Sequence, residues 1–175
     1  IKKDFEEKCK RTYAVLPAWG MHRMGDKGPK MQEYETYRGS LLQLKNALLS
    51  LAELSYSDIN DSQDVIIKEI FINMKVMINK RVLVGNSKAL CHLLPKIFGP
   101  IDNRYTLKFA GINNNSDKIE KQFTLFNFIH KEVYYKIVSD PRFQNFYKTL
   151  KNEKWNTSEL KVADNLIIGF VGSQE

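Results

Sequence analysis

The segment LVGNSKALCHLLPKIFGPIDNRYTLKF, residues 83–109, is the part of the chain around which we expect the fold to be organised. It contains a glycine, a short apolar run, a break between Pro95 and Pro100, and then a carboxylate followed by Arg104. The sequence on both sides of it shows helical periodicity, with apolar residues recurring at intervals of three and four. We therefore expect helices to surround this central segment.

A tight turn that opens a helix is predicted near Gly85. Glycine adopts positive φ without a Cβ penalty, and Asn86 or Ser87 can cap the helix that follows. Backbone N–H groups at such a helix start form a natural site for an anion, and Lys88 adds a charge nearby. The predicted helix extends from Lys88 to Leu94.

Asp102 follows the second break and precedes Asn103, Arg104 and Tyr105. One interpretation is a structural N-cap of a helix that begins at Asn103, with Arg104 as an ion-pair partner. The other is a carboxylate that serves as a general base or stabilises a developing cation. Lys88 and His92 are spaced i, i+4 and share a face, so Asp102 can complete a Lys–His–Asp cluster.

The remaining sequence predicts an all-α protein with about seven helices in a compact orthogonal bundle, including a helix-hairpin-helix-like turn near Gly85. We expect one helical domain over 1–175, or two lobes with a cleft at about 80–110. His130 is expected to be a structural histidine. The other predicted helices cover residues 2–16, about 32–55, 63–79, 117–138, a short one from Pro141, and a last one capped by Asn156 or Thr157.

The charge balance favours an anionic partner. There are 27 Lys and Arg against 20 Asp and Glu, a net charge of +7 with a pI near 9.3. The apolar and basic loop over 18–30 contains Trp19, Arg23 and Lys27, which can contact a phosphate backbone. The alternatives are a soluble basic surface and a loop that Trp19 pins to the core.

Several classes of function are not supported by the sequence. Cys9 and Cys91 cannot form a four-ligand zinc site or an iron–sulfur cluster, and we expect no metal and no cofactor. There is no P-loop, no dinucleotide-binding fingerprint, no His-Glu-x-x-His and no nucleophile elbow. No apolar run has the roughly 20 residues of a membrane span, so we expect a cytoplasmic protein without a membrane partner.

The central segment resembles the helix-hairpin-helix DNA glycosylases in its order of Val-Gly, Lys-Ala, an apolar helix, Phe-Gly-Pro and Asp. The resemblance implies an all-helical enzyme that flips the target base out of the duplex. It implies that Gly85, with Asn86 and Ser87, binds a DNA phosphate through backbone amides. It also implies a catalytic Asp102, a nucleophile at Lys88 and a DNA contact at Arg104. The sequence departs from the family at Leu83, where the first glycine of the hairpin is missing, and in a shorter Lys88–Asp102 separation.

The same segment is similar to a group of small uncharacterised bacterial proteins. The shared pattern consists of Ser87, Lys88, Leu90, His92, Leu93, Leu94, Pro95, Pro100, Asp102, Tyr105 and Thr106. This second resemblance implies no established activity. We therefore expect a DNA-binding helical protein, either a base-excision glycosylase or a diverged relative. The alternatives are a non-catalytic nucleic-acid-binding module and a helical protein-interaction domain.

Overall fold

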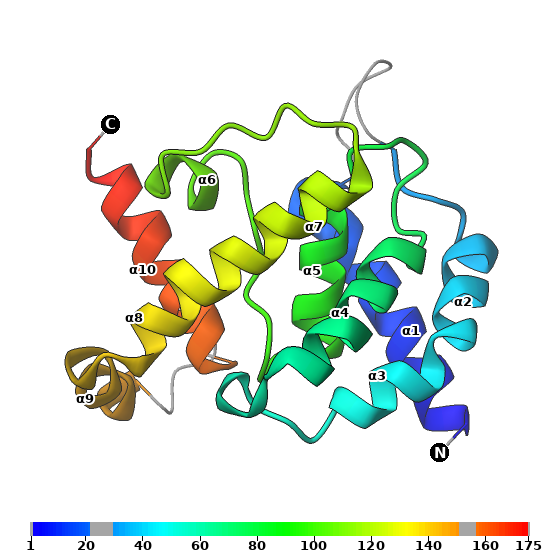
Figure 1. Ribbon diagram of the computed structural model, residues 1–175, viewed down its shortest axis with the longest axis horizontal. Helices are drawn as coiled ribbons and strands as arrows, with labels where there is room; N and C mark the ends of the chain where they lie inside the picture. Colours follow the sequence, from blue (N-terminus) through cyan, green and yellow to red (C-terminus); the bar gives the residue numbers. More distant parts are fainter. Residues whose placement is uncertain (1, 22–29, 151–156, 175) are drawn as a thin grey trace.

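The computed structural model describes residues 2–21, 30–150 and 157–174 (Figure 1). Over these residues the chain is helical, with no sheet, and its β-structure is a single antiparallel bridge between Met31 and Met77. The all-α prediction is confirmed. The α-helices are α1 (Lys2–Leu16), α2 (Tyr34–Gln43), α3 (Lys45–Leu51), α4 (Asp61–Asn73), α5 (Leu83–Leu93), α6 (Thr106–Phe109), α7 (Ile119–Phe128), α8 (Tyr135–Ser139), α9 (Pro141–Leu150) and α10 (Glu159–Gly172). Three shorter segments are η1 (Pro17–Met21) and η3 (Ile129–Tyr134), which are π-helical, and η2 (Tyr56–Asp58), which is 3₁₀-helical.

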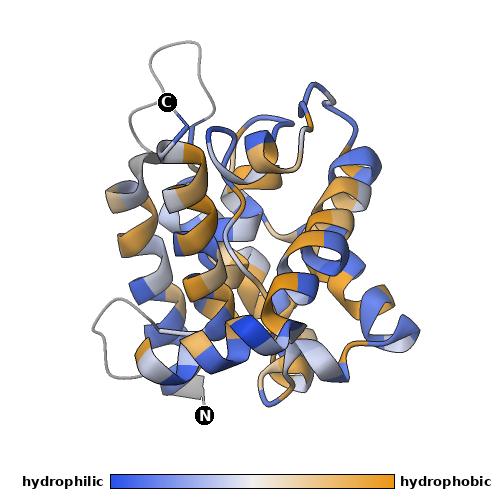
Figure 2. Cartoon of the chain, turned by 90° about the vertical axis from the view of Figure 1, so that its left-hand side faces the viewer, coloured by the Kyte–Doolittle hydropathy of each residue, from blue (hydrophilic) through white to orange (hydrophobic). Residues whose placement is uncertain are grey.

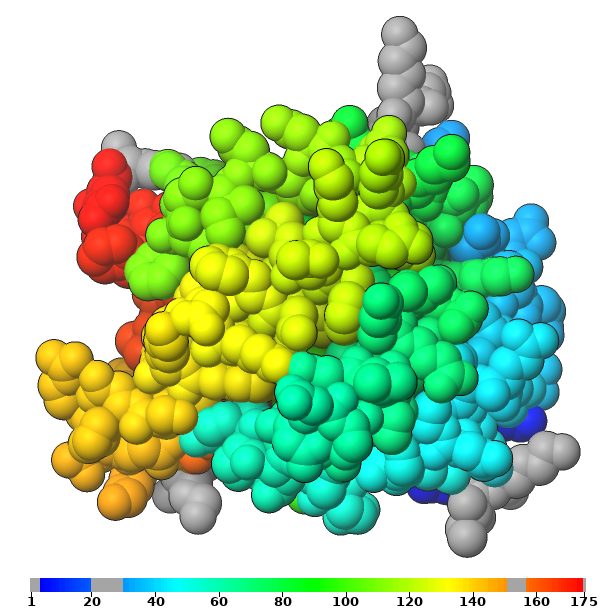
Figure 3. All heavy atoms as spheres, viewed as in Figure 1, coloured from blue at the N-terminus to red at the C-terminus, as the bar shows by residue number. Residues whose placement is uncertain are grey.

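Helix α5 lies at the centre of the fold (Figure 1). It packs against α1 and α7, and α4 packs against α7. Nine of its eleven residues are buried, including the polar Asn86, Ser87 and Lys88. The space-filling view shows α4 and the α7–α8 region covering this side of the molecule (Figure 3). Apolar and small side chains on most faces of a helix are typical of a helix that is enclosed in this way.

The predicted turn at Gly85 is wrong. Helix α5 begins at Leu83, and the amide of Asn86 already donates to the carbonyl of Val82 at 2.8 Å. Among the described glycines only Gly111 has a positive φ. The first amides of α5, at Val82 and Leu83, donate to Oε1 of Gln122 on α7, at 2.8 and 3.0 Å. Because a side chain some 40 residues away supplies this cap, the local sequence carries no sign of it.

Several helix boundaries follow from local capping chemistry. Asn60 caps α4 by accepting from the amide of Ser62 at 2.9 Å, and Pro141 occupies the first position of α9. Ser158, one residue beyond the predicted Thr157, caps α10. Helix α4 ends at Asn73 rather than Asn79, because the next residues are extended and pair with residues 30–32.

Hydropathy follows the packing of the helices. Most helices in Figure 2 carry both hydrophobic and hydrophilic stretches, as expected when one side of each helix faces the core. The buried apolar side chains form one cluster that includes residues from α1, α5, α7 and α10. Among the described residues, no helix has both the length and the apolar character required to cross a bilayer.

His130 joins η3 to the segment before Asp102. Its Nδ1 lies 2.8 Å from the carbonyl of Phe126, and its Nε2 lies 3.2 Å from the amide of Gly99. A neutral ring with its proton on Nδ1 donates to Phe126 and accepts from the amide of Gly99, and the carbonyl oxygen of Gly99 also lies 3.1 Å from Nε2. Complete burial lowers the pKa of His130 to about 4. The structural role expected for this histidine is confirmed.

The stability of the protein should fall as the pH drops below the ordinary pKa of histidine. Between about pH 6.5 and 4 the unfolded chain binds a proton at His130, whereas the folded chain does not. We expect a loss of about 2 kcal/mol in the free energy of unfolding from pH 7 to pH 5, measured by urea titration. In His130→Gln this contribution disappears, and an unchanged pH dependence in that variant would contradict the assignment.

Candidate functional site

Ser87 determines where Asp102 lies. Its hydroxyl on α5 accepts a hydrogen bond from the amide of Ile101 at 3.0 Å and donates to the carbonyl of Val84 at 3.0 Å. This bond fastens the segment 100–102 to the side of α5. Asp102 is the next residue, so its side chain is brought beside Lys88, one position further along α5.

Lys88 and Asp102, singled out together in the sequence, form an ion pair in the structure. Lys88 Nζ lies 3.6 Å from Asp102 Oδ2, and the two side chains are 9% and 36% exposed. Lys88 Nζ also donates to the carbonyl of Trp19 at 3.4 Å. Both distances are long for an ammonium with three donors, so this cation has weak contacts for its degree of burial.

Asp102 also has a structural role, which differs from the predicted helix cap. Its Oδ1 accepts from the amide of Arg104 at 2.7 Å, closing a turn over 103–105. Helix α6 begins only at Thr106, so Asp102 caps this turn rather than a helix starting at Asn103. The exposed side chain of Arg104 lies over the ring of Tyr105, with 5.2 Å between its guanidinium carbon and the ring centroid.

A second ion pair comes from α10. Lys161 Nζ lies 2.5 Å from Asp164 Oδ2, and Asp164 Oδ1 accepts from the hydroxyl of Tyr134 at 3.3 Å. The carboxylate of Asp164 is 4% exposed, and burial raises its pKa against the opposing effect of Lys161. No role was predicted for Lys161 from the sequence. The sequence did contain a signal for this ion pair: Asp164 lies on an apolar helix face, and Lys161 precedes it by three residues.

Trp19 stands between the two ion pairs. Its ring centroid lies 5.6 Å from Lys88 Nζ and 5.3 Å from Lys161 Nζ, within the range of cation–π attraction. The half-buried Trp19 belongs to η1, so three segments remote in sequence supply this cluster. The two lysines and two aspartates together carry no net charge.

A small hollow, which we call the acid–lysine pocket, opens at this cluster. Its volume is about 170 Å³. A cavity of about 150 Å³ holds a benzene molecule, so the acid–lysine pocket accommodates one ring. The lining residues are Trp19, Lys88, Pro100, Asp102, Tyr105, Lys161, Asp164 and Ile168.

His92 belongs to a different hollow, which we call the His92 pocket. Its volume is about 340 Å³, and Trp19 and Lys161 line both hollows. The ring of His92 meets the ring of Trp19 edge-on, with centroids 4.9 Å apart. The predicted Lys–His–Asp cluster therefore contains Lys88 and Asp102 without His92. Trp19 of η1 contacts both Lys88 and His92 on this face of α5. The i, i+4 spacing of the two residues gave no sign of this contact.

The predicted phosphate-binding residues of α5 are not accessible. Gly85, Asn86 and Ser87 are buried, and Asn86 Nδ2 donates to the carbonyl of Phe71 at 2.8 Å. The structure therefore does not place Gly85, Asn86 and Ser87 where they could contact DNA, because all three are enclosed within α5 by the rest of the fold. Arg23 and Lys27 lie outside the described residues.

Tyr134 contacts two residues that line the acid–lysine pocket, Pro100 and Asp164. Its buried hydroxyl donates to the carbonyl of Pro100 and reaches Asp164 Oδ1. A Cβ added at Gly99 would lie 2.7 Å from Cζ of Tyr134. Glycine at position 99 therefore permits the close approach that places Tyr134 between Pro100 and Asp164.

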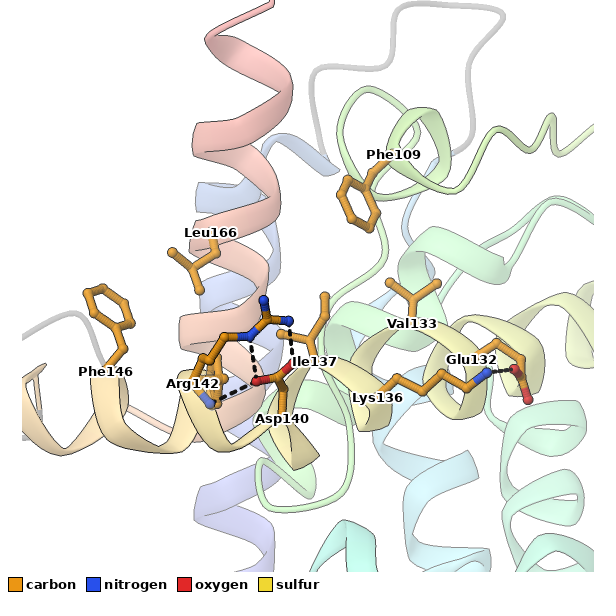
Figure 4. A pocket seen from close by; sticks show the side chains of 10 residues that line it. Phe109, Glu132, Val133, Lys136, Ile137, Asp140, Arg142, Phe146 and Leu166 are labelled. Carbon is orange, nitrogen blue, oxygen red and sulfur yellow. Dashed lines mark hydrogen bonds and ion pairs between the residues drawn. The ribbon is translucent and has the colours of Figure 1, made fainter.

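A third hollow, the apolar groove, is the largest of the three (Figure 4). It has a volume of about 560 Å³ and lies between α6, the α8–α9 corner and α10. Its charged side chains are paired with one another, Lys136 with Glu132 at 2.5 Å and Arg142 with Asp140 at 2.7 Å. Its apolar lining residues are Phe109, Val133, Ile137, Phe143, Phe146 and Leu166.

Substitution of Gly99 should destabilise the protein through Tyr134. Gly99→Ala places a methyl group against a fully buried ring that cannot retreat, and we expect a loss of about 1–3 kcal/mol in the free energy of unfolding. Gly39→Ala in α2 is the matched control, because a Cβ there meets nothing within 4 Å. Equal urea midpoints for the two variants would contradict the proposed packing role.

Lys88 should contribute little to stability despite its burial. In Lys88→Met a weakly paired buried cation is replaced by an apolar chain of similar length, which is often neutral or stabilising. We expect the free energy of unfolding to stay within about 1 kcal/mol of the wild-type value or to rise. A loss of several kcal/mol in urea titration would instead make Lys88 a structural residue.

No family model, curated protein or solved structure matches this chain. Among the described residues, no group of three or more His, Cys, Asp or Glu side chains is placed to hold a metal ion. The resemblance to the glycosylases therefore rests on the residues of the chain alone.

Proposed function

We propose that this protein binds DNA through the face that carries Trp19 and the acid–lysine pocket, and that it is a base-excision glycosylase or a diverged relative. The observation that carries this proposal is the meeting of Lys88 and Asp102, 3.6 Å apart, at the wall of a hollow that accommodates one ring. Lys88 and Asp102 are the two residues that the glycosylase resemblance marks as catalytic, and both line the acid–lysine pocket.

The chemistry requires a carboxylate beside the reacting sugar. When the glycosidic C–N bond breaks, its electron pair leaves with the base and the sugar acquires positive charge. Asp102 is partly exposed and held by the amide of Arg104, so its charge is in place to stabilise that cation. A water molecule then adds to the sugar carbon and its proton passes to the departing base, giving the free base and an abasic sugar.

Side chains rather than helix amides supply the phosphate contacts in this proposal. Arg104 is exposed next to Asp102, where it is accessible to a phosphate. Arg23 and Lys27 follow Trp19 in sequence, and the net charge of +7 favours a polyanion. The sugar ring fits the acid–lysine pocket by size.

Binding and catalysis should separate in Asp102→Asn. We expect wild-type protein to bind a labelled duplex in fluorescence anisotropy with an affinity that falls steeply with salt. Asp102→Asn should bind equally well but release no base from a panel of damaged and mismatched duplexes, measured by chromatography. Arg104→Ala should reduce the salt slope by about one unit. Binding that is absent, or independent of salt, would refute the proposal, and binding without base release by the wild type would favour a non-catalytic module.

The apolar groove favours a second candidate, a protein-interaction domain. Phe146 and Leu166 are each 41% exposed within a hollow whose charges are already paired. Apolar surface of this kind is common at binding sites for other proteins. Failure of DNA binding would leave this candidate as the better account.

A further inference from the structure

The apolar groove gathers a large share of the exposed apolar side chains of the protein. Among the described residues, eight large hydrophobic side chains are exposed. Three of them, Phe109, Phe146 and Leu166, line the groove, and a fourth, Phe170, meets the ring of Phe109 edge-on with centroids 5.6 Å apart. They come from α6, α9 and α10, so three separate helices bring them together. Exposed apolar side chains gathered in this way are typical of a surface that binds a partner.

The groove is open and does not enclose its contents. The side chains of Phe109, Phe146 and Leu166 remain 39%, 41% and 41% exposed, and in Figure 4 they project from three different ribbons around the hollow. A tightly bound small molecule has roughly 70–90% of its surface buried. An occupant of this open groove keeps one side in solvent, as a macromolecular partner does.

The walls of the groove favour a partner in helical conformation. They consist of helices, whose main-chain groups are bonded within each helix, so they offer no strand edge to an extended peptide. The aromatic side chains of the lining are phenylalanines, which have no polar group to bond the solvated backbone of a polyproline-type peptide. A helix satisfies its own backbone groups and presents one apolar face.

The charges beside the groove favour an acidic partner, because in both ion pairs the cation is the more exposed member. The side chains of Arg142 and Asp140 are 91% and 32% exposed. Those of Lys136 and Glu132 are 69% and 45% exposed. Ion pairs on the surface contribute little to stability, so these cations can also pair with carboxylates of a partner.

Arg142 has hydrogen-bonding capacity left for such a carboxylate. It donates to Asp140 through Nε and Nη2, and its Nη1 has no partner among the described residues. Asp140 also accepts from the backbone amide of Arg142 at 2.8 Å, so its carboxylate is held at the start of α9. A carboxylate that approaches the groove therefore meets an accessible guanidinium group.

We propose that the apolar groove binds an acidic amphipathic helix of a partner protein. The apolar face of that helix packs on the exposed apolar side chains of the groove, and its carboxylates lie beside Lys136 and Arg142. This inference rests on the second candidate function, a protein-interaction domain, and names the class of partner. It does not depend on DNA binding.

Two other occupants match the groove less well. A second copy of this chain carries the same net charge of +7, so electrostatic repulsion opposes its approach. A nucleic-acid strand would bring its phosphates beside Glu132 and Asp140, which repel them.

Designed peptides test the shape and the charge of the partner. Three labelled acidic peptides of about 18 residues carry leucine, isoleucine or phenylalanine at positions i, i+3, i+4 and i+7, with glutamates beside this stripe. Matched peptides have lysine in place of each glutamate, and scrambled peptides keep the composition without the stripe. In fluorescence anisotropy we expect saturable binding of at least one acidic peptide, about tenfold weaker binding of its lysine counterpart, and no binding of its scrambled form.

Surface variants locate the binding site. Phe146→Ser removes an exposed aromatic side chain and should weaken binding of the acidic peptide about tenfold, whereas Val65→Ser on α4, at a side chain that is 69% exposed, should not. Lys136→Glu should weaken binding of the acidic peptide and strengthen binding of its lysine counterpart. Lys121→Glu on α7 is the control for net charge. All four side chains are exposed, and thermal unfolding verifies that each variant is folded.

Each alternative occupant gives a different result. Absence of binding by all three acidic peptides, or binding that folded Phe146→Ser retains in full, overturns the inference. Preference for the lysine peptides overturns the acidic partner and, if Phe146→Ser removes that binding, leaves a protein-interaction groove. Self-association in analytical ultracentrifugation that Phe146→Ser abolishes would assign the groove to a second copy. Binding of a labelled single strand that Phe146→Ser weakens would assign it to nucleic acid, and either result overturns the inference.

Duplex binding tests the proposed DNA function separately. It is measured by anisotropy on the same proteins, and Phe146→Ser should leave it unchanged because the acid–lysine pocket does not include that residue. Duplex binding without peptide binding leaves the DNA function standing and removes the helix partner, whereas peptide binding without duplex binding does the reverse.

Discussion

The burial of α5 on nearly all its faces is the constraint on which the rest of the structure depends. A polar group on a buried helix is stabilised by a partner inside the protein, since an unpaired group costs the loss of its contacts with water. The amides of Val82 and Leu83 donate to the side chain of Gln122. The side chain of Asn86 donates to the carbonyl of Phe71, and the hydroxyl of Ser87 accepts from the amide of Ile101. These bonds join α5 to α7, to α4 and to the segment before Asp102.

The candidate site is a consequence of the same bonds. Because Ser87 holds Ile101, the next residue places its carboxylate beside Lys88. The bonds of Tyr134 to Pro100 and Asp164 bring α10 to the same place, and Gly99 permits the close approach of that ring. The cluster around Trp19 is therefore supported by fully buried groups on several sides, an arrangement suited to holding charges in a fixed geometry.

The two hollows beside Trp19 differ in the chemistry of the residues that line them. The acid–lysine pocket carries two ion pairs and accommodates one ring, whereas the His92 pocket is larger and has one unpaired nitrogen and apolar walls. The apolar groove also carries two ion pairs, and its lining residues come from α6, η3, α8, α9 and α10.

Elements that depend on interactions between near neighbours in the chain were predictable from the sequence. The apolar spacing predicted an all-helical chain, Pro141 marked the start of α9, and His130 was expected to be structural. It also singled out Lys88 and Asp102, although it did not establish that they meet. Tertiary structure decided what depends on distant partners: the Gln122 cap that makes Gly85 part of a helix, the position of Trp19 between two lysines, and the Lys161–Asp164 pair. The reason is physical, because periodicity and capping act over a few residues, whereas buried polar groups accept any partner that the packing brings within reach.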